Sequence, residues 1–185
     1  YMLRELALPG GGLASAQDAD TEGVEGLTYT WLPEEGAAAG IPADQLEPFE
    51  HGRLIVRGEL EAELRARVLT LRGERPQPFR DDKVLASWNG LALSAFAEAG
   101  RALGRPDYVA AAVDSGRFLT TSMMDGGRLM RSWKDGRARI KGYLEDYAMV
   151  GVGLLALYEA TFDRRWLDES RRLAEQALTL FWDEG

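Results

Sequence analysis

The sequence has no cysteine and only one histidine among its 185 residues. The absence of cysteine excludes disulfides, thiol catalysis and cysteine-ligated metals. It also fits a reducing compartment, and we expect a cytoplasmic location. The histidine, His51, follows Glu50 in an irregular stretch and is interpreted as a surface residue. An ordinary zinc or iron site would have at most one imidazole available, so we expect no metal and no cofactor.

Positive charge and long apolar runs are also scarce. The chain has 22 Lys and Arg against 30 Asp and Glu, which gives a net charge of −8. Phosphate binding needs a basic face, so we expect neither nucleic acid nor an anionic membrane surface as a partner. The longest apolar stretch, within 148–158, contains two glycines and is too short to span a bilayer. The N-terminus has no signal-peptide pattern, and both ends favour a piece of a longer polypeptide.

The remaining composition is that of a soluble globular protein, with 45% apolar and 28% charged residues. Apolar spacing and composition predict a mainly α fold, with helices over 59–72, 84–103, 106–124, 143–161 and 164–181. A short amphipathic helix is expected over 1–8, and another helix opens at Pro33. Small β-hairpins are expected near 13–32, around the loop DADTEGVEG, and over 128–141, where Asp135-Gly136 is a turn signal.

The two long apolar helices belong to an internal repeat. A shift of about 58 residues superposes a buried helix, a tight turn and a more polar helix on their counterparts. Repeated hairpins of this kind build an α-solenoid or a closed α/α toroid. A closed ring of six would need roughly 350 residues at this period, so we expect an arc. We divide the chain into 1–57, an N-terminal part with the first hairpin and an irregular loop, and 58–185, the helical hairpins.

Both apolar helices begin with polar and aromatic residues. In a closed ring of hairpins, the pocket would lie at these helix starts. A sugar site needs flat aromatic faces for C–H groups and carboxylates and amides for hydroxyls. One helix start holds Asp81, Asp82, Lys83, Trp88 and Asn89. The other holds Glu145, Asp146 and Tyr147. The alternative for each residue is structural: acids at a helix start can cap the helix or favour its dipole, Lys83 can pair with an acid, and Asn89 can satisfy buried backbone groups.

The stretch SAQDADTEGVEG invites comparison with a calcium loop. With Asp18 as position one, Asp20 takes position three. Position twelve is then Tyr29, where an EF-hand needs a bidentate Glu. A turn whose Asp side chains bind the local backbone is the favoured interpretation.

Three long motifs carry a resemblance to a known family: SAQDADTEGVEGLTYTW, DDKVLASWNGLALSAFAEAGRAL and GYLEDYAMVGVGLLALYEATFD. In this order they resemble the thioredoxin-domain-containing proteins of the spermatogenesis-associated protein 20 type and their bacterial relatives. The resemblance implies an N-terminal thioredoxin-like domain followed by an α/α toroid akin to six-hairpin glycosidases and N-acylglucosamine 2-epimerases. This chain would be an arc of the toroid, without the thioredoxin-like domain and the closing hairpins. It departs from the pattern between about 36 and 58, where it looks shortened.

The resemblance implies a carbohydrate-type pocket to which each motif contributes. The first motif adds Gln17, Asp18 and Asp20 to the residues of the two helix starts. The leading hypothesis is a sugar hydrolase or isomerase acting on a small molecule. Its acid–base pair would be Asp82 and Asp146, with Asp81 in reserve. Substrate would stack on Trp88 and Tyr147 and be oriented by Asn89, with Glu145 and Lys83 also binding. The histidine-dependent proton transfer of the sugar epimerases is not supported, because the chain has a single histidine.

Two alternatives come from other functional classes. In the first, the chain is a non-catalytic binding or scaffold module attached to a thioredoxin-like domain. In the second, it is a solenoid with a concave apolar face for protein binding. Carboxylates roughly 5–10 Å apart across an open pocket favour glycoside chemistry. Acids buried in salt bridges to Lys83 or Arg80 favour the scaffold. In either case an open arc exposes apolar surface, so we expect the chain to associate with itself.

Overall fold

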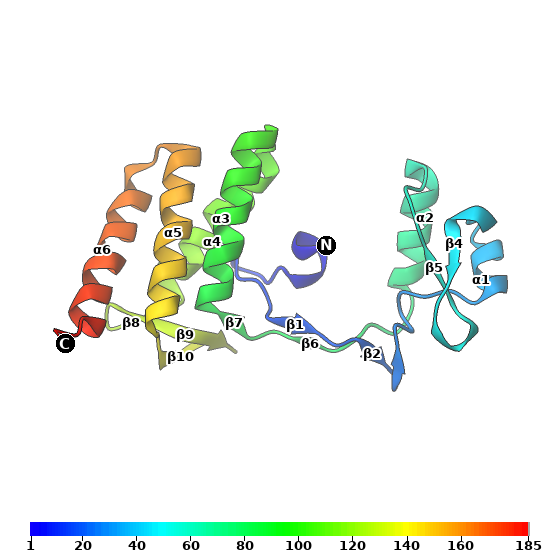
Figure 1. The fold of residues 1–185 in the computed structure, drawn as a ribbon, viewed down its shortest axis with the longest axis horizontal. Helices are drawn as coiled ribbons and strands as arrows, with labels where there is room; N and C mark the ends of the chain where they lie inside the picture. Colours follow the sequence, from blue (N-terminus) through cyan, green and yellow to red (C-terminus); the bar gives the residue numbers. More distant parts are fainter. Residues whose placement is uncertain (185) are drawn as a thin grey trace. The chain divides into compact units, whose positions relative to one another are not determined.

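The computed structural model describes residues 1–184, and these fall into two compact units. The first unit consists of residues 1–16 together with 80–184, and the second of residues 17–79. Two-residue strands, β1 (Ala16–Gln17) and β6 (Arg80–Asp81), lie where the chain passes from one unit to the other. Figure 1 shows the elements of both units, which are described one at a time.

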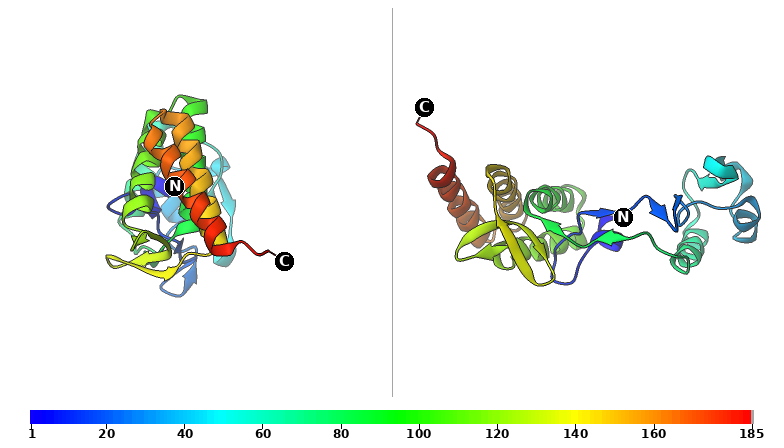
Figure 2. Two further views of the ribbon diagram at one scale, coloured as in Figure 1. Left: turned by 90° about the vertical axis from the view of Figure 1, so that its left-hand side faces the viewer. Right: turned by 90° about the horizontal axis from the view of Figure 1, so that it is seen from below.

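The first unit is built on four helices: α3 (Ala86–Leu103), α4 (Pro106–Thr121), α5 (Leu144–Thr161) and α6 (Arg164–Phe181). Helix α3 packs against both α4 and α5, and α5 also packs against α6. The two apolar helices, α3 and α5, run in the same direction, and α3, α5 and α6 stand in a row (Figures 1 and 2). The unit is therefore two helical hairpins, α3–α4 and α5–α6, set side by side.

The helices recur at the interval of the sequence repeat. Helix α3 covers residues 86–103 and α5 covers 144–161, while α4 and α6 begin at residues 106 and 164. The turns match as well, because Gly104 and Phe162, the C-caps of α3 and α5, are both left-handed, at φ 62° and 54°. The repeat inferred from the 58-residue shift of the sequence is therefore also a repeat of backbone conformation.

Two glycines let α3 and α5 approach closely. A Cβ on Gly90 would lie 2.5 Å from the carbonyl carbon of Met149, and one on Gly153 would lie 2.5 Å from the carbonyl oxygen of Gly90. Real Cβ atoms do not approach backbone atoms this closely, so only glycine fits at both positions. The small residues of the apolar helices are thus explained by backbone contact between them.

A small antiparallel sheet lies at the end of the unit where α3 and α5 begin (Figure 1). Its central strand, β9 (Arg128–Lys134), pairs with β10 (Arg137–Lys141) and with β7 (Val84–Leu85), and also with β8 (Met124–Asp125). The β9–β10 turn is Asp135-Gly136, with φ values of 52° and 76°. Both φ values are positive, as in the two-residue hairpin turn that an Asp-Gly pair predicts.

The core of the first unit lies between the helices. It includes Leu93, Leu119, Leu129, Val150, Leu154, Leu157 and Trp166, all almost inaccessible to solvent. The N-terminal segment contributes Leu8 and Ala14 to the same core. Its short helix, η1 (Met2–Leu6), has π geometry rather than the α-helix expected over 1–8.

The second unit is smaller and has its own core of Trp31, Ala39, Ile41 and Val68. Its helices are α1 (Pro33–Ala38), α2 (Ala62–Gly73) and the 3-10 turns η2 (Ala43–Gln45) and η3 (Glu50–Gly52). It contains two hairpins, β2 (Asp20–Thr21) with β3 (Val24–Glu25), and β4 (Leu46–Pro48) with β5 (Leu54–Val56).

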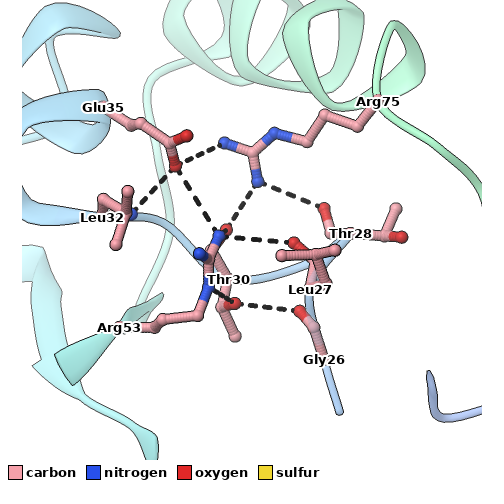
Figure 3. Close-up of polar contacts among 8 residues, drawn as sticks. All are labelled: Gly26, Leu27, Thr28, Thr30, Leu32, Glu35, Arg53 and Arg75. Atoms are coloured by element: carbon pink, nitrogen blue, oxygen red, sulfur yellow. Dashed lines mark hydrogen bonds and ion pairs between the residues drawn. The ribbon is translucent and has the colours of Figure 1, made fainter. Parts of the chain in front are cut away.

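Two arginines and one glutamate tie the second unit together (Figure 3). Arg75 lies 3.0 Å from Glu35 and also donates to the carbonyl of Thr30. Arg53 donates to the same Thr30 carbonyl at 2.9 Å and lies 3.7 Å from the Glu35 carboxylate. Both guanidinium groups are mostly shielded from water and donate hydrogen bonds to backbone carbonyls. They therefore fix the turn of residues 26–30 against α1.

The prediction of a mainly α fold with small antiparallel hairpins is confirmed. The hairpin over 128–141 forms as expected, whereas the one near 13–32 is shorter than expected. Its strands are residues 20–21 and 24–25, within the stretch predicted to be a loop, and its turn is Glu22-Gly23 with both φ values positive. A two-residue turn with positive φ closes a hairpin tightly, which the longer loop could not. The division at residues 57 and 58 stays a prediction.

Within residues 1–184, every helix falls short of the length or the apolar character that crossing a bilayer requires.

The glycine contact between α3 and α5 predicts opposite effects for two substitutions in one helix. Gly153→Ala forces α5 away from the Gly90 carbonyl and should lower the free energy of unfolding by about 1–3 kcal/mol. Gly151→Ala meets only Ser170 at 3.9 Å, so it should raise stability by up to about 1 kcal/mol through helix propensity. Chemical denaturation of the two variants tests this; equal effects would contradict the close contact.

Candidate functional site

The beginnings of α3 and α5 are joined by one buried carboxylate. Asp146, in the first turn of α5, accepts a hydrogen bond from the backbone N–H of Ser87 in α3 at 3.1 Å. Its other oxygen accepts from the backbone N–H of Tyr143 at 2.8 Å, which is the return bond of a capping box. The same oxygen lies 3.2 Å from the Arg131 guanidinium, and the side chain is fully buried. This carboxylate therefore has partners at both oxygens.

Arg131, on β9, is the positive centre of this helix start. It lies 2.6 Å from the exposed carboxylate of Glu145 and covers the Tyr143 ring at 4.6 Å from the ring centre. Glu145 first, and Asp146 with it, raise the pKa of Arg131 above its ordinary value. Sequence reasoning missed Arg131, because its role depends on where β9 lies and not on any spacing.

Asp81 and Asp82 are also paired with basic side chains. Asp81 receives hydrogen bonds from Lys83 Nζ at 3.0 Å and from Lys134 Nζ at 3.1 Å, and one from the Lys83 backbone. The Lys83 ammonium, then that of Lys134, holds the pKa of the Asp81 carboxyl well below its usual range. Asp82 is half-exposed and accepts from Arg80 Nε at 2.6 Å.

The amide of Asn89 is fully used inside the unit. Its side-chain oxygen accepts from the backbone N–H of Leu13 at 2.8 Å, and its nitrogen donates to the carbonyls of Leu13 and Leu85. Asn89 is buried, and it pins the N-terminal segment to the first turn of α3. This is the structural role weighed for it from the sequence.

The two aromatic residues predicted to stack a substrate differ in accessibility. Trp88 is 55% exposed at the start of α3. Tyr147 is 1% exposed, and its ring meets Phe181 edge-on at 5.7 Å between centres. A ring buried to this degree presents almost no face to a substrate in this structure.

The remaining predicted residues belong to the second unit. Gln17 accepts a hydrogen bond from the Tyr29 hydroxyl at 2.8 Å, and Asp18 and Asp20 are exposed, Asp20 in the β2–β3 hairpin. His51 is exposed, as expected. Within residues 1–184 no group of three or more His, Cys, Asp or Glu side chains is arranged to hold a metal ion.

Comparison with known proteins adds a relationship over almost the whole sequence. No family model matches the chain. Proteins named spermatogenesis-associated protein 20 match 99% of it, at 34% identity in Rattus norvegicus, 33% in Mus musculus and 31% in Homo sapiens.

The chain is homologous to spermatogenesis-associated protein 20.

It spans 31% of the length of these three relatives. The rat alignment, at 247 positions, is longer than the 185-residue chain, so spermatogenesis-associated protein 20 carries segments inside this region that the chain lacks. An uncharacterised protein of Caenorhabditis elegans also matches, at 28% identity over 60% of the chain. The resemblance to the spermatogenesis-associated protein 20 type is thus confirmed, whereas its extension to a toroid and to bacterial relatives stays a prediction.

The buried carboxylate predicts a large difference between two neighbouring acids that share Arg131. Asp146→Asn leaves a guanidinium without its buried partner and turns an amide donor toward a backbone N–H, so it should lower the free energy of unfolding by about 3–5 kcal/mol. Glu145→Gln removes an exposed partner of the same arginine and should cost less than about 1 kcal/mol. Urea denaturation of the two variants measures both free energies of unfolding. Similar losses of stability in the two variants would show that burial of Asp146 does not determine its contribution.

The pKa of Asp81 predicts an acid-dependent contribution to stability. A carboxyl with a depressed folded-state pKa stabilises the fold above its unfolded pKa of about 3.9, and this contribution is lost as the pH falls toward the folded pKa. The stability difference between the wild type and Asp81→Asn should therefore be constant from about pH 5 to 7 and shrink below about pH 4.

Lys134→Met serves as the control, because it removes one ammonium and leaves Lys83 in place. Lys134→Met should reduce the loss of stability between neutral and acidic pH without abolishing it. Denaturant midpoints measured across the acid range would contradict the assignment if Asp81→Asn left the pH profile unchanged.

Proposed function

We propose that this chain is a non-catalytic helical module of a protein of the spermatogenesis-associated protein 20 type. The observation that carries the proposal is the buried Asp146, whose oxygens are both occupied by backbone N–H groups and Arg131. A general acid or base must reach a proton on the substrate. A carboxylate without solvent access and with both oxygens bound is suited to joining two helices instead.

The other two acids support the same proposal. Asp81 binds two ammonium groups that keep it ionised, so it is a poor proton donor at neutral pH. Asp82 pairs with Arg80. Salt bridges to Lys83 and Arg80 are those expected of a scaffold, but the Asp81 and Asp82 side chains are 30% and 50% exposed rather than buried.

A second candidate, carbohydrate binding without catalysis, is favoured by one observation. Trp88 exposes about half of its surface near the start of α3, and Asp82 and Tyr143 are also accessible. An exposed indole and a free carboxylate oxygen are the groups with which proteins hold sugars. In this version of the proposal the small-molecule partner is a sugar, and no cofactor takes part.

The wider setting is also part of the proposal. The regular recurrence of the hairpins along the chain supports an arc of an α/α toroid. The proposed thioredoxin-like domain of the longer protein rests on the sequence resemblance, and the proposed cytoplasmic location on the absence of cysteine.

The catalytic hypothesis and the proposed module differ in a turnover assay. We expect the wild-type chain to release no product from a panel of aryl glycosides and to isomerise no aldose or ketose, because Asp146 is buried with both oxygens bound, Asp81 is held ionised by two ammonium groups and Asp82 is paired with Arg80. Sugar-dependent thermal shifts measured in parallel test binding, and Trp88→Ala should remove any shift.

Asp82→Asn provides the matched variant, since Asp82 is half-exposed and its loss should leave the fold intact. Turnover by the wild type that disappears in Asp82→Asn, with an unchanged melting temperature, would overturn the proposal and restore Asp82 as a catalytic acid.

A further inference from the structure

Three buried polar atoms of the first unit have no hydrogen-bond partner within residues 1–184, and their side chains line one depression. The atoms are Arg128 Nε, Tyr147 OH and Gln176 Oε1. The depression, the β9–α6 pocket, has a volume of about 450 Å³ and lies between the turn that leads into β9 and one side of α6 (Figure 1). A buried polar atom without a partner costs free energy, so proteins normally supply one.

The preceding repeat has no such atoms at the same three positions. The counterparts of Arg128, Tyr147 and Gln176 are, in that order, Gly12, Asn89 and Phe118. Asn89 uses both ends of its amide on backbone groups, and neither Gly12 nor Phe118 has a polar side chain. The Phe118 ring also fills the space, since a Cβ on Gly12 would lie 3.0 Å from it.

The correspondence of Gly12 with Arg128 follows from the two segments that carry them. Residues 10–13 read GGGL and come before α3, whereas residues 126–129 read GGRL and come before α5. Both segments end in a buried leucine. The second repeat therefore has an open pocket and three polar groups where the first repeat is filled and satisfied.

A hairpin following α6 in a longer protein would not cover this pocket. The α6 wall of the pocket consists of Arg172, Glu175 and Thr179. The counterparts of these residues on α4 are Asp114, Arg117 and Thr121. All three counterparts are exposed although the next hairpin, α5–α6, is in place. This side of the outer helix therefore stays open to solvent within the repeat architecture.

The amide of Gln176 is held in one orientation. Its Nε2 donates to the carbonyl of Gly127 at 3.0 Å, and Arg172 Nη1 donates to the same carbonyl at 3.2 Å. Only the amide nitrogen donates hydrogen bonds, so Oε1 is the end that remains as a free acceptor. These bonds also attach the turn before Arg128 to α6, which places a free donor and a free acceptor in one pocket without joining them.

The three atoms specify the chemistry of a ligand. Arg128 Nε is a donor, the Tyr147 hydroxyl donates or accepts, and Gln176 Oε1 accepts. Arg128 is also a cation without an ion pair inside residues 1–184. A carboxylate is the group that accepts from a guanidinium and a phenol together. Gln176 then requires a donor on the same ligand.

We propose that the β9–α6 pocket binds a small carboxylic acid that carries a hydroxyl or ammonium group beside its carboxylate. The carboxylate accepts from Arg128 and Tyr147, and the second group donates to Gln176. Tyr147 takes part through its hydroxyl alone, and its ring stays buried. Arg128 and Gln176 are half-buried, so small rotations of these long side chains bring their free atoms to the ligand. The inference is independent of the roles of the acids at the starts of α3 and α5.

Four three-carbon compounds test the ligand chemistry at constant ionic strength. L-lactate has the carboxylate with a hydroxyl, and L-alanine has it with an ammonium group; propionate lacks the donor and propylene glycol lacks the carboxylate. A ligand of the folded state raises the melting temperature. At millimolar concentration L-lactate or L-alanine should raise it, and the tighter of the two identifies the donor. Propionate and propylene glycol should bind at least about tenfold more weakly.

Tyr147→Phe removes the hydroxyl and keeps the ring. Titration calorimetry should show binding weakened by about tenfold, because a hydrogen bond to a carboxylate is lost. Without ligand the variant should be as stable as the wild type or slightly more stable, since the hydroxyl has no partner in the protein. Arg128→Met should weaken binding by at least the same factor.

Tyr158→Phe is the matched control, because Tyr158 lies on α5 but outside the pocket. It should bind the ligand like the wild type. Three results would overturn the proposal: no rise in melting temperature with either L-lactate or L-alanine, an equal rise with propionate, or unchanged binding in Tyr147→Phe. A loss of stability in ligand-free Tyr147→Phe would also count against it, because the hydroxyl would then have a partner within the fold.

Discussion

The buried carboxylate of Asp146 is the constraint on which the first unit depends. It closes the first turn of α5, reaches the backbone of α3 at Ser87, and pairs with Arg131 on β9. A charge without access to water is tolerated only when it is paired and hydrogen-bonded. These bonds therefore hold the starts of α3 and α5 and the strand β9 in fixed positions relative to one another.

Much of the fold could be predicted because its determinants are local. The period of the apolar residues, Pro106 in the first turn of α4 and the Asp135-Gly136 turn each act within a few residues, so the helices and the β9–β10 hairpin were predicted nearly to their ends. The hairpin of residues 20–25 was misjudged for the same reason. Glu22-Gly23 supplies a two-residue turn that composition alone does not distinguish from a long polar loop.

The roles of the candidate site residues were less predictable, because they depend on solvent exposure and on partners distant in sequence. Asp81 and Asp146 are natural candidates for chemistry from residue type, yet Lys134 and Arg131, which determine their state, come from a strand about fifty and fifteen residues away. Tyr147 and Trp88 occupy similar places in their motifs, but one ring is buried and the other exposed. Sequence spacing identifies which residues gather, whereas packing determines which of them meet solvent.

The glycine contact between α3 and α5 also bears on which helices of the repeats can pair. Repeats with similar surfaces risk exchanging hairpins, because each hairpin could dock on another copy as well as on its own. Here the backbone-to-backbone approach of Gly90 and Gly153 is available only to α3 and α5. One repeat away the equivalent positions are Ala148 and Ala95, whose Cβ atoms prevent the same approach. The two glycines therefore fix the register of the pairing, whereas exchange of a hairpin between copies would keep both of them.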